Sequence, residues 1–149
     1  MSNPKNGPLV SETSICNQAL SWLGANPITS FNDKSTVAEL CRNNYAFLRD
    51  AVLEERYWTF ALAKDTSEVA DKDGWDDKYI HPIPEGWLSV HRVYRSIGPS
   101  KLQAEWRMED GGIASPCSKI YMEGIRRIVD TNVMSSMFVQ CLAARIAAD

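Results

Sequence analysis

A chain of 149 residues that is 44% hydrophobic is long enough to bury a core, which excludes an intrinsically disordered protein. Its formal net charge of −3 argues against a protein that holds nucleic acid by its phosphates, because such proteins concentrate lysine and arginine. We therefore expect one globular domain over residues 1–149.

The first predicted elements are an arm and a short helix. Prolines and a glycine interrupt residues 1–10, which predicts an extended arm. Apolar side chains recur at helical spacing between Ile15 and Leu23, which predicts a helix with Ser11 or Thr13 as its N-cap. Gly24 suits the left-handed residue that often follows a helix.

A second helix is predicted to begin at Thr36. The stretch Thr36–Glu39 matches a capping box, in which the two side chains bond each other's backbone amides. Since the connection to the first helix is short, residues 11–58 are expected to form an antiparallel helical hairpin. Apolar residues at steps of three and four predict its buried face: Val37, Cys41, Tyr45, Leu48 and Val52.

From residue 59 to residue 130 the helical period is lost and short extended stretches replace it. Between two of these stretches, Asp110-Gly111 predicts a hairpin turn, because glycine accepts a positive φ. Residues 59–62 are read as a short strand or a frayed helix end, and residues 71–77 as a polar loop. The predicted strands are 88–94, 103–108, 113–115, 119–122 and 125–129, with an extended stretch at 79–84.

The helical period returns over residues 131–149 and predicts a helix that closes the bundle. The predicted fold class is therefore α+β: an antiparallel helical hairpin plus a C-terminal helix forming a small bundle, with an inserted antiparallel β segment.

Five tryptophans are many for this length, and they divide by their position in the predicted elements. Helical or helix-end positions favour the core, whereas loops and strands leave core and interface both open, since tryptophan is enriched at binding hot spots. Trp75 stays open between these two interpretations. The candidate core residues are Trp22, Trp58, Phe60, Tyr45 and Trp87, and the candidate interface residues are Trp75, Trp106, Arg126 and Arg127.

The sequence contains no recognisable catalytic or cofactor signature. His81 follows Asp76 and Asp77, yet no nucleophile or orienting partner accompanies it, and a surface position at a strand end is the simpler interpretation. The acidic loop 71–77 lacks the ligand spacing of a calcium loop, and no glycine-rich phosphate loop occurs. We predict no catalytic residue, no cofactor and no metal site.

The four cysteines are too far apart in sequence to form a zinc-type pair. Most of them lie in apolar periodic stretches, which predicts free thiols that pack as small hydrophobic side chains in a reducing compartment. The sequence has no signal-peptide pattern and no apolar run near the roughly 20 residues that span a bilayer. No membrane association is expected.

Several stretches, in this order, resemble the head-to-tail adaptor proteins of short-tailed phages, of the tail tubular protein A type. Members of that family usually continue beyond the last helix predicted here. The stretches that carry the resemblance are Ile15–Leu20 with Leu23-Gly24, Pro27-Ile28, Ala38–Tyr45 and Trp58–Ala61, with weaker echoes at Pro84–Leu88, Ile120-Tyr121 and Phe138–Ala147.

The resemblance implies a structural virion protein that is not an enzyme. It implies a ring of twelve copies that is assembled in the host cytoplasm, binds the portal protein and the tail nozzle protein, and continues the DNA channel. A tail fibre is a further candidate partner. Passing DNA would make transient, non-specific contact with a mildly acidic wall, whose repulsion reaches only about 8 Å at physiological salt.

Two other functions are compatible with the same residues. The chain is alternatively another phage neck part, such as a head-completion or tail-terminator protein. A small enzyme that uses His81 and the neighbouring aspartates is the remaining alternative.

Overall fold

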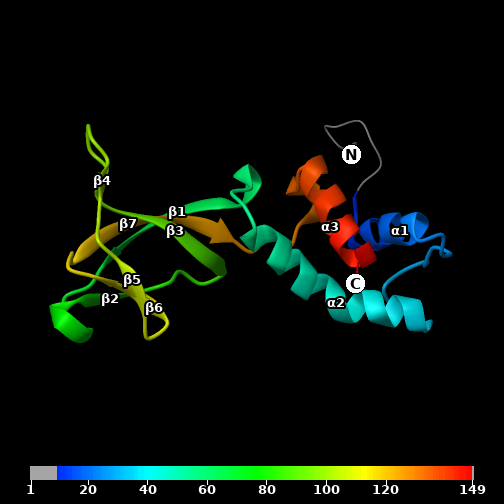
Figure 1. Cartoon of the computed structure of the whole chain (residues 1–149), viewed down its shortest axis with the longest axis horizontal. Coiled ribbons are helices and arrows are strands. Elements are labelled where there is room, and N and C mark those ends of the chain that lie inside the picture. Colours follow the sequence, from blue (N-terminus) through cyan, green and yellow to red (C-terminus); the bar gives the residue numbers. More distant parts are fainter. Residues whose placement is uncertain (1–9, 149) are drawn as a thin grey trace. The chain divides into compact units, whose positions relative to one another are not determined.

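The computed structural model describes residues 10–148, so the predicted arm lies outside the described residues except for Val10. These residues form two compact units: a helical unit of residues 10–60 and 128–148, and a β unit of residues 61–127. Three helices and antiparallel sheets confirm the α+β class (Figure 1). The predicted insertion of residues 59–130 corresponds closely to the β unit. No helix in the described part of the chain is long and apolar enough to cross a membrane.

Helix α1 spans Glu12–Trp22 and is capped by Ser11, one of the two predicted caps. The Ser11 side chain accepts a hydrogen bond from Ser14 N–H at 3.0 Å, and Ser14 Oγ accepts one from Ser11 N–H at 2.8 Å. Gly24 follows the helix with a φ of 74°, as its position in the sequence predicts.

Helix α2 spans Thr36–Glu54 and helix α3 spans Ser136–Ala148. Two short turn elements complete the helical unit and its border with the β unit: η1 (Thr59–Ala61) and η3 (Thr131–Val133). The predicted capping role of Thr36 is wrong, because Ser35 is the N-cap and its side chain accepts from Ala38 N–H at 3.2 Å. Serine one position earlier supplies the same oxygen acceptor, and sequence patterns commonly miss helix ends by one residue. Helix α3 packs against both α1 and α2 (Figure 1).

The core of the helical unit contains Tyr45 and Trp58, which are 2% and 7% exposed. The Trp58 ring meets the Phe138 ring edge-on with centroids 5.0 Å apart, and Phe60, which is half-buried, meets the same ring at 5.1 Å. The core position predicted for Trp22 is wrong, because its side chain is 51% exposed. Trp22 is the last residue of α1. Helical periodicity identifies the apolar face of a helix, but it does not show whether another helix covers the end of that face.

Seven strands form two antiparallel sheets in the β unit. The four-stranded sheet has the order β1-β7-β3-β4, and the three-stranded sheet has the order β2-β6-β5. Their bounds are Leu62–Glu68 (β1), Tyr79–Pro82 (β2), Trp87–Ser96 (β3), Leu102–Gln103 (β4), Arg107–Glu109 (β5), Gly112–Ser115 (β6) and Lys119–Arg126 (β7), and the short turn element η2 spans Trp75–Asp77.

The predicted hairpin turn at Asp110-Gly111 is confirmed. Both residues have positive φ, 51° and 73°, and they join β5 to β6 with Glu109 paired to Gly112. Two left-handed residues give the turn type whose twist matches that of the flanking strands. The extended stretch at 79–84 forms β2, and the predicted strands 119–122 and 125–129 are joined into β7, which ends at Arg126.

The core of the β unit is a cluster of Val93, Ile113, Ile120 and Met122. Trp87 is half-buried and packs against this cluster, in agreement with its predicted core role. Trp106, a predicted interface residue, is also half-buried and packs against the same cluster. The segment between β4 and β5 therefore contributes Trp106 to the core instead of presenting the whole ring to a partner.

His81 is completely buried, so its predicted surface position is wrong. Its Nε2 lies 2.9 Å from the Cys117 carbonyl oxygen and its Nδ1 lies 2.8 Å from Ser67 Oγ. In the neutral ring Nε2–H donates to the carbonyl, which can only accept, and Nδ1 accepts from the Ser67 hydroxyl. Through these bonds β2 of one sheet is joined to β1 of the other.

The substitution His81→Gln is expected to lower the free energy of unfolding by about 1–2 kcal/mol, because one of the two part-buried hydrogen bonds of the ring would be lost. Urea denaturation of the purified variant measures this loss. His91→Gln is the control, since His91 lies on the exposed side of β3 and its loss should stay within about 0.5 kcal/mol. Equal stability of the wild type and His81→Gln would contradict the joining role.

Candidate interaction site

Trp75 is the most exposed tryptophan that the structure describes and the centre of the candidate site. Its side chain is 77% exposed in η2, which decides against the alternative that it fills the core of the sheet. Met108 on β5 is also 54% exposed, and both residues line one shallow depression together with Arg107, Glu109 and Asp110. We call residues 74–77 and 107–110 the Trp75 tip.

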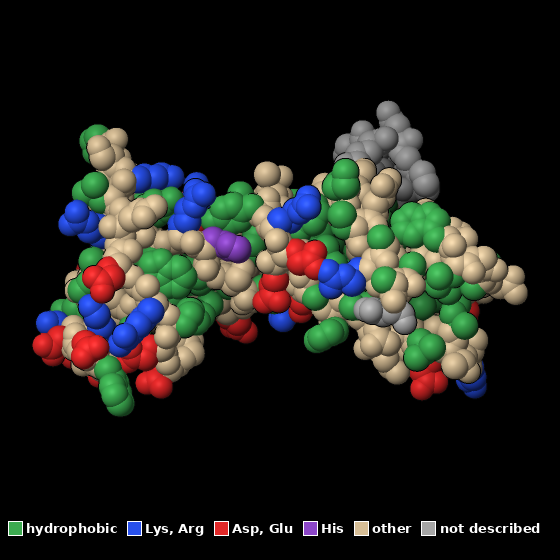
Figure 2. Space-filling view, in the orientation of Figure 1, with side chains coloured by type: hydrophobic (Ala, Val, Ile, Leu, Met, Phe, Trp, Pro, Cys, Tyr) green, Lys and Arg blue, Asp and Glu red, His purple; other side chains and the backbone are tan. Residues whose placement is uncertain are grey.

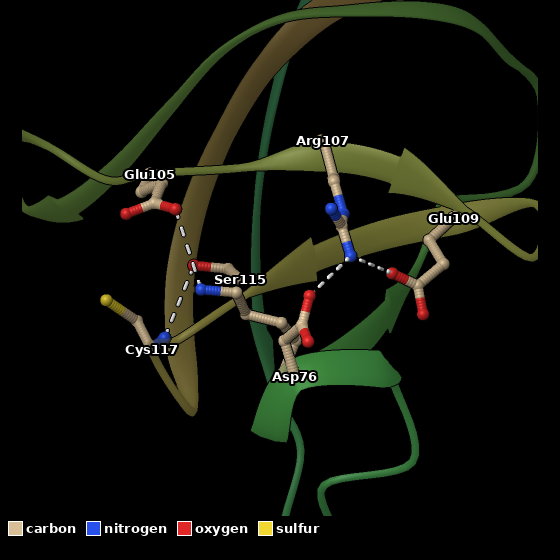
Figure 3. Close-up of polar contacts among 7 residues, drawn as sticks. Asp76, Glu105, Arg107, Glu109, Ser115 and Cys117 are labelled. Carbon is tan, nitrogen blue, oxygen red and sulfur yellow. Dashed lines mark hydrogen bonds and ion pairs between the residues drawn. The ribbon is translucent and has the colours of Figure 1, made fainter.

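Polar contacts hold the Trp75 backbone against the hairpin of β5 and β6. Trp75 N–H donates to Glu109 Oε1 at 2.8 Å across 34 residues of sequence. Arg107 Nη2 lies 3.1 Å from a Glu109 oxygen and 3.5 Å from an Asp76 oxygen, so it joins η2 to β5 (Figure 3). Arg107 and Asp76 are largely exposed, and each such ion pair alone contributes at most about 1 kcal/mol. Their combined effect is to fix the position of the loop.

The backbone of η2 has an uncommon conformation. Asp76 and Asp77 have φ of 60° and 58°, in the left-handed region that costs most residues about 1–2 kcal/mol and that aspartate tolerates better than most. Gly74 N–H donates to the Lys78 carbonyl at 3.0 Å, which closes the turn. A Cβ at Gly74 would lie 2.7 Å from Ile80 Cδ1 and 3.0 Å from the Lys78 carbonyl oxygen, so a side chain there would crowd the turn. Strain of this kind is typical of functional loops.

Glu109 is the acidic group on which the tip depends. The hydrogen bond from Trp75 N–H, followed by the contacts with Arg107, lowers the pKa of Glu109 below its ordinary value of 4.5. A carboxylate with a lowered pKa in the folded state stabilises the fold above the unfolded value, and this contribution is lost as the pH falls through the folded value.

We therefore expect Glu109→Gln to be less stable than the wild type at neutral pH, with a difference that shrinks as the pH falls below 4.5. Urea denaturation at a series of pH values between neutral and acidic measures the difference. Glu105→Gln is the matched control, because the Glu105 side chain is 78% exposed and water screens its ion pair with Lys78, at 3.5 Å. A difference for Glu109→Gln that does not change with pH would contradict this assignment.

The remaining predicted interface residues lie on the other sheet. Arg126 is exposed at the end of β7, paired with Trp87 of β3, and Arg127 is exposed beside it, with its N–H donating to the Gly86 carbonyl at 2.7 Å. The structure therefore does not bring these arginines to the Trp75 tip.

Sequence reasoning missed Arg107, Met108 and Glu109 as partners of Trp75. The turn signal at Asp110-Gly111 predicts the hairpin that carries them. Nothing in the sequence, however, shows that loop 71–77 folds back onto this hairpin. The contact depends on tertiary structure, since it joins residues 34 positions apart.

Catalytic chemistry finds little support in the described residues. Both ring nitrogens of His81 are occupied by Ser67 and Cys117, and the ring has no exposed surface from which to reach a substrate. Within residues 10–148 no three His, Cys, Asp or Glu side chains are placed to hold a metal ion together. All four cysteines are free, and burial raises the pKa of the Cys16 thiol far above its usual range. Burial makes that thiol a poor nucleophile.

The Trp75 tip therefore presents an exposed tryptophan whose backbone is held by a hydrogen bond, and tryptophan is enriched at protein-binding hot spots. Comparison of the chain with models of protein families and with curated proteins finds no match.

Proposed function

We propose that this chain is a structural virion protein, a ring-forming head-to-tail adaptor that joins the phage portal to the tail nozzle and continues the DNA channel. The observation that carries the proposal is the Trp75 tip, in which a tryptophan is 77% exposed while its backbone N–H is held by Glu109. An exposed tryptophan on a held backbone has the character of a binding hot spot, because the backbone loses little conformational freedom when a partner covers the ring.

The stretches that carry the resemblance also contact one another in the helical unit. The Asn17 side chain accepts from Ile28 N–H at 2.8 Å and donates to the Ile28 carbonyl at 3.0 Å, which joins the first of these stretches to the second. Trp58 packs on Phe138 of the last stretch. These stretches therefore build one packed unit, which is the part of the chain on which the proposed adaptor function depends.

The helical unit offers a further surface for assembly. Leu23, Leu40 and Phe47 are 61%, 58% and 75% exposed, although each is apolar. Exposed apolar groups that lie on neighbouring helices are typical of proteins that bury them against a partner. A ring closes when one face of each subunit meets a different face of the next, so a subunit needs more than one such surface.

Imaging of virions by electron cryomicroscopy, with antibody labelling of this chain, tests the proposal. We expect the label at the vertex that carries the portal, and a ring in direct contact with the portal. A label that is absent from virions would overturn the proposal. A ring that contacts only other tail proteins would favour the alternative of a tail-terminator protein.

Trp75→Ala is expected to reduce the yield of portal-bound rings by about 10-fold or more, while the melting temperature changes by no more than a few degrees. Negative-stain counting of rings on purified portal and a thermal melt measure the two effects. Val129→Ala is the control, because it removes an apolar side chain that is 59% exposed and lies outside both proposed surfaces. An unchanged ring yield for Trp75→Ala would remove this residue from the interface.

A further inference from the structure

A second surface of the β unit is a hollow on the outward face of the four-stranded sheet. Strand register places Thr66 and Tyr94 on either side of Tyr121, so the three side chains lie on one face, opposite to the core residues Val93 and Met122. Between β1, β3 and β7 this face encloses about 390 Å³. We call it the sheet hollow, and its lining includes Lys64, Thr66, Tyr94, Ile97, Lys101 and Tyr121.

Lysines and tyrosines together give the sheet hollow its chemistry. Lys101 Nζ lies 5.3 Å from the ring centroid of Tyr94, and Lys119 Nζ lies 5.7 Å from that of Tyr121. Ile97 at the rim is 51% exposed. The floor and rim therefore combine apolar and aromatic surface with lysine ammonium groups, which can contact an aromatic side chain and a neighbouring carboxylate.

Two carboxylates also line the sheet hollow, and both are already engaged. Glu123 lies 3.9 Å from Lys101 Nζ and accepts a hydrogen bond from Tyr94 OH at 3.4 Å. Asp65 accepts from the N–H of Thr66 at 2.7 Å. The lining therefore balances two lysines against two carboxylates, and Lys119, beside the hollow on the same outward face, adds one further positive charge.

The Trp75 tip, together with the adjoining residues 71–73, 78, 105 and 106, has the complementary character. Carboxylates outnumber cations along Asp71–Lys78 and Glu105–Asp110, and Figure 2 shows acidic side chains gathered at the end of the β unit that carries β2 and β5. At the centre of this acidic surface stands an indole that is 77% exposed. The same chain thus has an acidic surface with an aromatic projection and, on its other sheet, an aromatic hollow with lysines around it.

We propose that the Trp75 tip of one copy of this chain docks in the sheet hollow of a second copy. The two surfaces are different, so the contact is heterologous, and the pair keeps one unused hollow and one unused tip for further neighbours. A volume of about 390 Å³ lies in the lower part of the range of roughly 300–1,000 Å³ for ligand pockets, so one aromatic side chain fits and a folded element does not. This inference rests on the proposed ring and names a subunit contact within it.

Photo-crosslinking tests the contact directly. A benzophenone amino acid replaces Trp75 in the full chain, and a concentrated solution is irradiated and analysed by mass spectrometry. We expect crosslinks between copies that map to peptides containing Thr66, Ile97 or Tyr121. The control carries the same amino acid at Trp22 and should not label these peptides. Absence of crosslinks between copies, or crosslinks only to other surfaces, would overturn the proposal.

Charge reversal tests the electrostatic part. Lys64→Glu with Lys101→Glu in one variant, and Asp71→Lys with Asp73→Lys in another, are each expected to raise the dissociation constant of self-association about 10-fold or more. An equal mixture of the two variants should recover association, because the reversed tip meets the reversed hollow. Lys34→Glu is the control in the helical unit and should have no effect. Failure of the mixture to recover would contradict the pairing.

The two proposals fail in different ways. Rings that form normally on the portal with both charge-reversed variants would refute the contact and leave the adaptor function intact. A wild-type chain that is absent from virions, even if its copies crosslink through Trp75, would refute the adaptor function and leave the contact intact.

Discussion

Replacing Trp58 with alanine is expected to lower the free energy of unfolding by about 3–5 kcal/mol. The indole is 93% removed from solvent, with a relative exposure of 7%, and its edge-on contact with Phe138 joins the segment after α2 to α3. Its Nε1–H also donates to the Val52 carbonyl at 2.9 Å, near the end of α2. Alanine would leave a cavity and remove the hydrogen bond from that carbonyl, so the two losses add.

Two further variants separate these contributions. Trp58→Phe keeps much of the ring packing but has no indole N–H, so its loss should be about 1–2 kcal/mol. Trp22→Ala removes the same side chain from a position that is 51% exposed, and its loss should be under about 1 kcal/mol. Chemical denaturation followed by far-ultraviolet circular dichroism gives all three values. A stability of Trp58→Ala close to that of the wild type would contradict the core placement of Trp58.

Local chemistry predicted those parts of the fold in which neighbouring residues decide the conformation. Ser11 caps α1, Gly24 ends it, and Asp110-Gly111 makes the hairpin, because each of these depends on a few adjacent backbone groups. Strand β1 was largely missed for the opposite reason. Its sequence from Leu62 to Glu68 is mostly polar and its burial pattern is mostly exposed, so pairing with β7 makes it a strand.

The helical unit shows the same limit in the packing of helices. Periodicity selected Cys41, Tyr45, Leu48 and Val52 correctly as buried positions on α2. It also selected Val37, which is 38% exposed, in the first turn of the helix. Helical spacing determines which residues share a face. How much of that face is buried depends on where the other helices lie.

For the candidate site, the sequence predicted that Trp75 could lie in an interface. It did not predict which residues surround Trp75. The acidic, glycine-containing loop around Trp75 left two alternatives open, an exposed interface position and a place in the core of the sheet. Its hydrogen bond to Glu109 and the ion pair of Asp76 with Arg107 exist because a loop and a hairpin meet in space. Trp106 was predicted to lie in an interface, yet its ring packs against the cluster that contains Val93 and Met122. This contact could not be predicted from the neighbouring sequence.

Gly124→Ala is expected to destabilise the β unit by about 3 kcal/mol or more. Gly124 lies in β7 between β1 and β3, beside an irregularity in the pairing of β3. A Cβ there would lie 2.1 Å from the Ser89 carbonyl oxygen and 2.9 Å from the Trp87 ring. The first of these atoms belongs to the backbone of the neighbouring strand, so it moves only if the pairing of β3 with β7 is disturbed. Gly124 is therefore the residue that allows Trp87 to lie against the sheet.

Three matched variants test this explanation by thermal and urea denaturation. Gly98→Ala should cost little, because its Cβ would have Ser96 Oγ as its nearest neighbour at 3.9 Å. Gly124→Ala combined with Trp87→Leu should recover only part of the loss, since removal of the ring leaves the contact with the Ser89 carbonyl in place. Full recovery in the double variant would show that the ring alone opposes a side chain at Gly124. If Gly124→Ala were as stable as the wild type, the close approach of the β3 backbone to Gly124 would be contradicted.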